Sequence, residues 1–339
     1  MHQGITLNQF FNEQWHQQPD IDVDLLALVD DMARACKRIA HAVSRGPLRN
    51  DLGNAGSENV QGEQQKKLDL IANDIMLRCH EWTGRVAALA SEEMETIHPV
   101  ADAAKRGKYL LVFDPLDGST NIDVNLSIGT IFSVLPAPAD RSQISEQDFL
   151  QPGRNQLCAG YAIYGPSTVL VLTLRQGVHS FVLDEDIGEF ILFDADHRIP
   201  EQCCEFAINS ARQRLWEGPV QRYIADCIAG SEGPQRKDYT MRWVGAMVAD
   251  AHRVLSRGGI FLYPRNPYSA DKPGKLRLLY EANPLALLVE QAGGRATTGT
   301  EPVLDVQPHK LHQRIPLILG SADEVARVEA YHRTDQGDG

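Results

Sequence analysis

The sequence lacks long hydrophobic runs and any pattern of paired cysteines. None of its apolar stretches approaches the ~20 residues that span a bilayer, and residues 1–11 have neither the basic nor the apolar part of a secretory signal, so we expect a cytoplasmic protein without a membrane partner. The six cysteines form no C-x-x-C pair and no zinc ligand set, which argues against a disulfide-rich domain. For the adjacent Cys203 and Cys204, a place in a core strand is favoured over a redox role.

Positive charge is also scarce. Lys and Arg number 33 against 45 Asp and Glu, a formal net charge of −12, and a nucleic-acid partner would need clustered basic residues. A phosphorylated small molecule remains compatible, because metal ions and a local basic pocket can hold it. The 339 residues, 43% of them hydrophobic, suffice for two domains, which we expect at residues 1–196 and 197–339.

The hydrophobic spacing predicts two long helices, then a run of strands, and then a second mixed region. The first half is expected to contain helices at residues 22–45 and 64–82, strands at 86–90, 109–113, 128–135, 159–164, 168–174, 180–183 and 189–193, and loops at 49–61 and 136–156. The second half is expected to contain strands at 205–208, 260–263, 276–280 and 316–319, helices at 244–256 and 284–291, and a last helix with Ser321 and Glu324 as a capping box. This order is typical of an α/β (α+β) fold with helices packed on a largely antiparallel sheet.

The most informative motif is Asp114-Pro-Leu-Asp-Gly-Ser-Thr120, which follows a buried strand directly. Its two carboxylates are three residues apart, the proline fixes φ and the glycine permits a sharp turn. Backbone N–H groups after Asp117 can face an anion. Taken alone, the motif is equally compatible with an ordinary Asp-rich turn.

Further acids follow other predicted strands. Glu92 and Glu93 come after strand 86–90, and Glu281 comes after strand 276–280. If these strands are neighbours, the carboxylates converge at one edge of the sheet, which is costly unless cations neutralise them. Oxygen-only ligands favour Mg²⁺ or Mn²⁺ over zinc.

Several blocks resemble class I fructose-1,6-bisphosphatase in the family's own order, over nearly the whole chain. They are Lys66-Lys-Leu-Asp69, Ser91-Glu-Glu93, Asp114-Pro-Leu-Asp-Gly-Ser-Thr-Asn-Ile-Asp123, Met247-Val-Ala-Asp-Ala-His-Arg253, Gly259-Ile-Phe-Leu-Tyr-Pro264 and Lys275-Leu-Arg-Leu-Leu-Tyr-Glu281. The resemblance implies a layered α-β-α-β-α sandwich of the sugar phosphatase type, with an N-terminal regulatory-type domain, a C-terminal substrate-binding domain and a homotetramer. It also implies hydrolysis of fructose 1,6-bisphosphate by a metal-activated water, in gluconeogenesis or the Calvin cycle.

The resemblance also implies a role for each matching residue. Two or three Mg²⁺ ions, with Mn²⁺ as the alternative, would be held by Glu92, Asp114, the carbonyl of Leu116, Asp117 and Glu281, with Glu63 joining a further metal. Glu93, assisted by Asp69, would orient or deprotonate the attacking water. The substrate contacts would be Asp117, Gly118, Ser119 and Thr120 at the 1-phosphate, Asn209, Tyr263 and Lys275 at the sugar and 6-phosphate, and Arg242 at the 6-phosphate of a neighbouring subunit.

The chain departs from the family at three places. Trp243 and Arg212 stand where the family usually has Tyr, and we expect Arg212 to compensate with a charge-assisted contact to the 6-phosphate. Family members that respond to AMP hold its phosphate at a Gly-rich turn before the first long helix. Here Asp20-Ile-Asp-Val-Asp-Leu-Leu26 stands at that place. The three Asp residues repel a phosphate, so we expect weak AMP inhibition or none.

Four alternatives compete with this interpretation. A sedoheptulose-1,7-bisphosphatase would need few changed contacts, whereas an inositol-phosphatase-like enzyme is disfavoured by the blocks at residues 259–264 and 275–281. A non-catalytic phosphosugar-binding protein is disfavoured because Glu92, Asp114, Asp117 and Glu281 are all acids. A thiol-regulated chloroplast-type enzyme is disfavoured because residues 136–156 contain no Cys.

Overall fold

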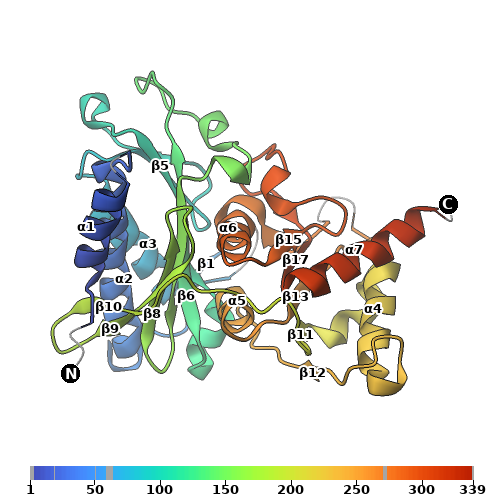
Figure 1. Ribbon diagram of the computed structural model, residues 1–339. Helices are drawn as coiled ribbons and strands as arrows, with labels where there is room; N and C mark the ends of the chain where they lie inside the picture. The colour runs from blue at the N-terminus through green and yellow to red at the C-terminus, as the bar shows by residue number, and fades with distance from the viewer. Residues whose placement is uncertain (1–3, 19, 50, 59–63, 270–272, 338–339) are drawn as a thin grey trace.

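The protein is built in five alternating layers of helix and sheet (Figure 1). The computed structural model describes residues 4–18, 20–49, 51–58, 64–269 and 273–337. From one side to the other, the layers are helices α1 (Leu7–Gln17), α2 (Val23–Arg49) and α3 (Lys67–His80), an eight-stranded sheet, helices α5 (Met247–Arg257) and α6 (Asn283–Gln291), a five-stranded sheet, and helices α4 (Gly218–Ile228) and α7 (Ala322–Gly337). This arrangement confirms the predicted α-β-α-β-α sandwich.

The eight-stranded sheet contributes one edge of the site. Its spatial order is β10 (Glu189–Asp194), β9 (His179–Asp184), β8 (Thr168–Thr173), β7 (Cys158–Tyr164), β6 (Ile128–Pro136), β5 (Tyr109–Asp117), β3 (Val86–Ser91) and β4 (His98–Pro99). Every neighbouring pair is antiparallel except β3 and β5, which are parallel. Because helices cover both faces, β3 and β5 are buried along their whole length, and they therefore read as continuous apolar runs.

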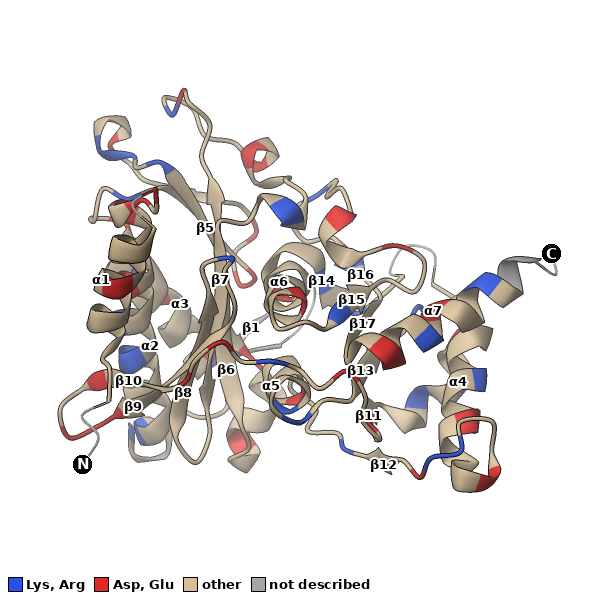
Figure 2. Ribbon diagram, in the orientation of Figure 1, with Lys and Arg blue, Asp and Glu red and all other residues tan. Residues whose placement is uncertain are grey.

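The second sheet has the order β12 (Thr240–Met241), β11 (Glu205–Ile208), β13 (Ile260–Tyr263), β17 (Leu317–Gly320) and β15 (Arg295–Thr297). A separate ladder pairs β14 (Leu276–Arg277) with β16 (Arg314–Ile315). Short 3₁₀ helices occupy Ala103–Lys105, Ser119–Val124, Glu146–Phe149, Gly153–Asn155, Ser210–Leu215, Gly230–Glu232 and Val303–Asp305. On the outer helices α4 and α7, basic and acidic residues are interspersed (Figure 2). Among the described residues, no helix is long and apolar enough to cross a membrane.

Two predictions in the first helical layer were wrong, and α1 was not predicted. The expected loop at 49–61 contains β1 (Asn54–Glu58), which pairs with β2 (Gln64–Lys66), and Glu63 lies outside the described residues. The expected helix end near residue 45 is also wrong, because α2 continues through Gly46 to Arg49. Gly46 is buried against Leu68 of α3, so tertiary packing outweighs its low helix propensity.

Three predictions in the second half also need correction. The apolar run at 276–280 is a strand only over Leu276–Arg277 and then becomes a π-helical turn, Leu278–Ala282, because such a short buried run does not distinguish strand from helix. The capping box is not formed, since Glu324 is buried and accepts hydrogen bonds from Tyr223 and Tyr239. Cys203 and Cys204 precede β11 and are partly exposed rather than in a core strand.

Candidate active site

The parallel pairing of β3 and β5 places two pairs of acids side by side. Ser91 pairs with Phe113, and the Glu92 N–H donates to the Phe113 carbonyl at 3.1 Å. Glu92 and Glu93 therefore leave β3 beside Asp114 and Asp117 of β5. The sequence argument depended on three strand ends being neighbours, and this is met for β3 and β5, whereas β14, which precedes Glu281, belongs to a separate ladder.

A sharp turn then carries the chain away from β5. Gly118 has φ of +85°, and a Cβ on it would lie 2.5 Å from the Cβ of Ala246, so both conformation and space favour glycine. The 3₁₀ helix Ser119–Val124 begins directly after it. Asp117 Oδ2 accepts the Val248 N–H from the first turn of α5 at 2.7 Å, which fixes the carboxylate at the base of the cavity.

Glu281 reaches the same place from the other half of the chain. It lies in the π-helical turn before α6, and its Oε2 accepts the Arg277 N–H at 2.6 Å. The Arg277 side chain is buried and lies between two acids, with Nη1 2.5 Å from Glu92 Oε1 and 3.9 Å from Glu281 Oε2. Arg277 therefore neutralises part of the negative charge from within the protein.

One internal cation does not compensate the whole cluster. Burial, reinforced by the charge of Glu92, raises the pKa of Glu281 to about 8 and that of Asp114 well above its usual range. Burial also raises the pKa of Asp117 to about 7, although the Val248 N–H opposes this. The protein alone thus favours protonated carboxyl groups here, and bound cations would favour the ionised groups.

The geometry of these acids fits a hard metal ion. Asp114, Asp117 and Glu281 each present a carboxylate oxygen within 4.8 Å of the others, and all three are buried. Glu92 is joined to them through Arg277. An all-oxygen donor set with several carboxylates suits Mg²⁺ or Mn²⁺ better than zinc.

Two further acids border the cluster on the side of α3. Glu93 Oε2 accepts a hydrogen bond from Gln65 Nε2 at 2.6 Å, and Asp69 Oδ2 accepts the Lys66 N–H at 2.8 Å. Burial and the charge of Glu92 raise the pKa of Glu93 to about 7, and burial raises the pKa of Asp69 to about 6. A carboxylate with a pKa near neutrality is suited to accept a proton from water.

The site is the floor of a cavity of about 560 Å³. Its lining also includes Trp243, stacked on Phe261 with ring centroids 5.8 Å apart, and Tyr263, whose ring lies 5.9 Å from Lys275 Nζ. The predicted site residues that line the cavity are Asp69, Glu92, Glu93, Asp114, Leu116, Asp117, Gly118, Ser119, Thr120, Asn209, Tyr263, Lys275 and Glu281. Arg242 does not line it; its Nη1 bonds the Met241 carbonyl at the exposed sheet edge.

Sequence reasoning missed three residues that shape the site. Arg277 lies within the motif at residues 275–281, but no role was predicted for it. Its apolar neighbours in the sequence were the available signal that it is buried. Gln65 could not be found from sequence spacing, because it lies in β2 and its contact with Glu93, which follows β3, forms only in the folded protein. Asp250 accepts the Val244 and Gly245 N–H groups at 2.9 and 3.0 Å and so supports the wall beneath Trp243.

Comparisons with known proteins agree with this architecture. The family model "Fructose-1-6-bisphosphatase, N-terminal domain" matches residues 5–195, and the corresponding C-terminal domain model matches residues 199–333. The chain is similar to the crystal structure of Leishmania major fructose-1,6-bisphosphatase in its holo form, with 37% sequence identity and a TM-score of 0.90 over 97% of this chain and 99% of that one. With its acid cluster, its five layers and both family domains in order, this chain belongs to the metal-dependent fructose-1,6-bisphosphatase family.

Proposed function

We propose that this protein hydrolyses the 1-phosphate ester of fructose 1,6-bisphosphate, releasing fructose 6-phosphate and inorganic phosphate. The observation that carries the proposal is one cavity that holds buried carboxylates, the Gly118–Thr120 turn and the cationic Lys275. Water supplies the oxygen that bonds to phosphorus, the bond from phosphorus to the sugar oxygen breaks, and the sugar oxygen takes up a proton.

The chain's own groups divide this work between them. Asp114, Asp117 and Glu281, with Glu92 and the Leu116 carbonyl, would hold two or three Mg²⁺ ions. Such ions, when bound, polarise a phosphoryl group and lower the pKa of water. Glu93, held by Gln65, orients the attacking water and accepts its proton, and Asp69 assists from α3.

The remaining predicted residues bind the substrate. Ser119, Thr120 and the backbone after Asp117 hold the 1-phosphate, while Asn209, Tyr263 and Lys275 hold the sugar and its 6-phosphate. The remote phosphate then supplies binding energy that positions the reacting end. Arg242 is directed to the 6-phosphate site of a second subunit, which its place at the sheet edge supports.

We further propose the finer assignments that follow from the sequence. Residues 1–196 form the domain that carries most metal ligands, and residues 197–339 form the substrate domain. Mg²⁺ is the proposed physiological metal, the proposed assembly is a homotetramer, and the proposed setting is carbohydrate metabolism in the cytoplasm.

A sedoheptulose bisphosphate is a second candidate substrate. A further cavity of about 250 Å³ shares Asn209, Tyr263 and Lys275 with the first, and Arg212 lines it. One additional sugar carbon would move the distal phosphate toward that arginine.

The test is phosphate release from fructose 1,6-bisphosphate, sedoheptulose 1,7-bisphosphate and inositol monophosphate, each with Mg²⁺ and with EDTA. We expect Mg²⁺-dependent release, fastest with the first substrate. Asp117→Asn should lower turnover at least ~10²-fold, by analogy with the loss of one transition-state stabiliser. Asp186→Asn, at an exposed turn, is the matched control. Preference for inositol monophosphate, or no release from any substrate, would contradict the proposal.

A further inference from the structure

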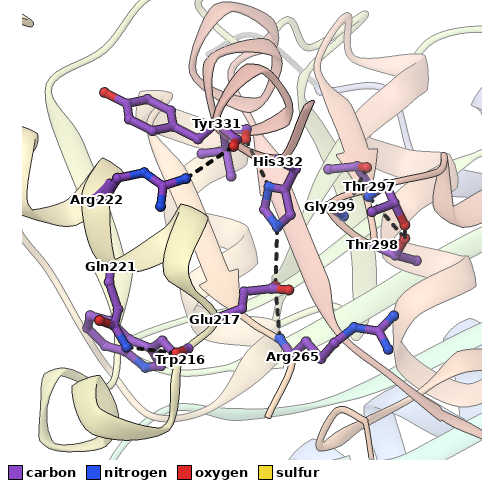
Figure 3. Close-up of polar contacts among 12 residues, drawn as sticks. Trp216, Glu217, Gln221, Arg222, Arg265, Thr297, Thr298, Gly299, Tyr331 and His332 are labelled. Carbon is purple, nitrogen blue, oxygen red and sulfur yellow. Dashed lines mark hydrogen bonds and ion pairs between the residues drawn. The ribbon is translucent and has the colours of Figure 1, made fainter. Parts of the chain in front are cut away.

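A largely buried ion pair that does not line the active-site cavity joins the start of α4, α7 and the segment that follows β13 (Figure 3). His332 Nε2 lies 3.2 Å from Glu217 Oε1, and the same oxygen accepts the Arg265 N–H at 3.3 Å. The His332 and Glu217 side chains are only 6% and 16% exposed. The pair therefore connects three segments that are distant in sequence.

Glu217 is the N-cap residue of α4, yet its side chain does not cap that helix. A carboxylate at this position ordinarily accepts an N–H from the first helical turn. Here it turns instead toward α7 and toward the chain that leaves β13. The local capping interaction is replaced by a tertiary one.

The geometry around His332 favours a charged ring. Its Nδ1 lies 2.9 Å from the Val328 carbonyl and its Nε2 lies 3.2 Å from Glu217 Oε1, so both nitrogens are close to an oxygen. The contact between Nε2 and Glu217 is an ion pair by distance rather than a formed hydrogen bond, and it is attractive in the imidazolium form, in which both nitrogens carry a proton. Gly299 makes room for the ring, because a Cβ there would lie 2.6 Å from His332 Nε2.

His80 shows what the same local contact does without an acid. Its Nδ1 also bonds the carbonyl four residues earlier, Met76, at 2.6 Å, and the ring is fully buried. Among the described residues its Nε2 has no hydrogen-bond partner. Burial lowers the pKa of His80 to about 4, so that ring is neutral.

The other charged groups on the elements packed against this end of α7 have their own contacts. Arg222 of α4 donates to the Tyr331 carbonyl, Arg295 of β15 pairs with Glu329, and Arg327 pairs with the buried Glu324. Glu217 is thus the carboxylate that faces the His332 ring from α4.

Two segments next to Glu217 in the structure are continuous with residues that line the proposed substrate cavity. The 3₁₀ helix Ser210–Leu215, which carries Arg212, follows Asn209 and ends just before Trp216 and Glu217. Arg265 lies two residues after Tyr263, and Asn209 and Tyr263 line both cavities. Fixing Glu217 therefore fixes the spacing between these two parts of the wall.

We propose that Glu217 and His332 are positioning residues that set this spacing, and so tune the binding of the distal half of the sugar bisphosphate. The proposal rests on the proposed function for its kinetic readout. Because neither residue lines the cavity that holds the acid cluster, the loss of the pair should change KM and leave kcat nearly unaltered. Because it needs the imidazolium, its effect should weaken as pH rises and the ring loses its proton.

The kinetic test uses fructose 1,6-bisphosphate and saturating Mg²⁺. Glu217→Ala should raise KM about tenfold with kcat within about twofold, the pattern of lost ground-state binding. Glu217→Gln should restore KM, because its amide oxygen accepts from Arg265 and its NH₂ donates to a neutral His332. The KM of the wild type, divided by the KM of Glu217→Gln at the same pH, should rise with pH, because only the wild-type pair depends on the charged ring.

The control is His80→Gln, which removes the same carbonyl contact from α3 and should leave KM within about twofold of the wild type. An unchanged KM in Glu217→Ala, or an equal fall in kcat, would overturn the proposal. If the alanine variant does not fold, His332→Gln provides the same comparison.

If the wild type does not hydrolyse fructose 1,6-bisphosphate, the proposed function fails separately. An NMR titration of the histidines, assigned with His332→Gln, still tests the pair, and a neutral His332 at pH 7 would refute it.

Discussion

Metal binding should release protons from this protein, and the number released can be worked out from the acid cluster. A carboxyl group with a pKa of about 8, as for Glu281, keeps its proton in about nine molecules of ten at pH 7. Asp117, with a pKa of about 7, is about half protonated, and burial raises the pKa of Asp114 as well. Since a bound cation requires ionised ligands, Mg²⁺ binding at pH 7 should release more than one proton.

The pH dependence follows from the same raised pKa values. As pH rises through 8, Glu281 and Asp117 lose their protons before the metal arrives, so the number released should decline. The metal-free protein should lose stability over the same range, because its folded state holds protons that the unfolded state has already lost. We restrict the comparison to pH 7 and above, where the buried neutral His80 does not contribute.

The measurement is calorimetric titration with Mg²⁺ in two buffers of different ionisation enthalpy, which gives the proton count directly. Glu281→Gln should lower the count at pH 7 by about one. Glu185→Gln, exposed between β9 and β10, is the matched control and should change nothing. A release below about half a proton at pH 7 would show that Arg277 already keeps these acids ionised, and the electrostatic reasoning would be wrong.

Three further outcomes are expected. Lys275→Ala should raise KM for the bisphosphate with a smaller effect on kcat, and an unchanged KM would remove Lys275 from the site. Arg212→Ala should also raise KM if its charge replaces the usual hydroxyl, whereas an unchanged KM would make it a tolerant rim position. AMP should inhibit weakly or not at all, because Lys108 is already paired with Asp22 and Asp24 at 2.6 and 2.9 Å. Half-inhibition at low micromolar AMP, in a titration at near-KM substrate, would contradict this.

The sequence correctly predicted the part of the site whose residues lie at the ends of β-strands. Val86–Ser91 and Tyr109–Asp117 are buried apolar runs that end in acids, and their parallel pairing brings Glu92 and Asp114 together. Here the identity of each residue, its strand and its direction all follow from short patterns. The turn at Gly118 belongs to the same class, because its positive φ has a local sequence signature.

The part that sequence did not predict depends on tertiary packing. Glu281 was expected at a strand end but lies in a π-helical turn, since a buried apolar run of that length fits either state. Arg277 gives no pattern of its own, because its role exists only once Glu92 and Glu281 approach from two different layers. β1 was not predicted for another reason. Its Asn, Gly and Ser residues favour a loop, but pairing with β2 makes the segment a strand.

The middle helical layer explains how an acidic protein can hold a substrate with two phosphate groups. Asp117 is fixed by a backbone N–H of α5, and Glu281 lies in the turn that precedes α6, so both helices between the sheets begin at the acid cluster. Arg277 balances only part of the negative charge of these acids, and bound cations would balance the rest and attract the phosphoryl group to be cleaved. In the proposed function the second phosphate needs positive charge of its own, which Lys275 in the lining of the same cavity would provide. The net charge of −12 therefore does not oppose phosphate binding, because the carboxylates that contribute to it are the groups that recruit the cations.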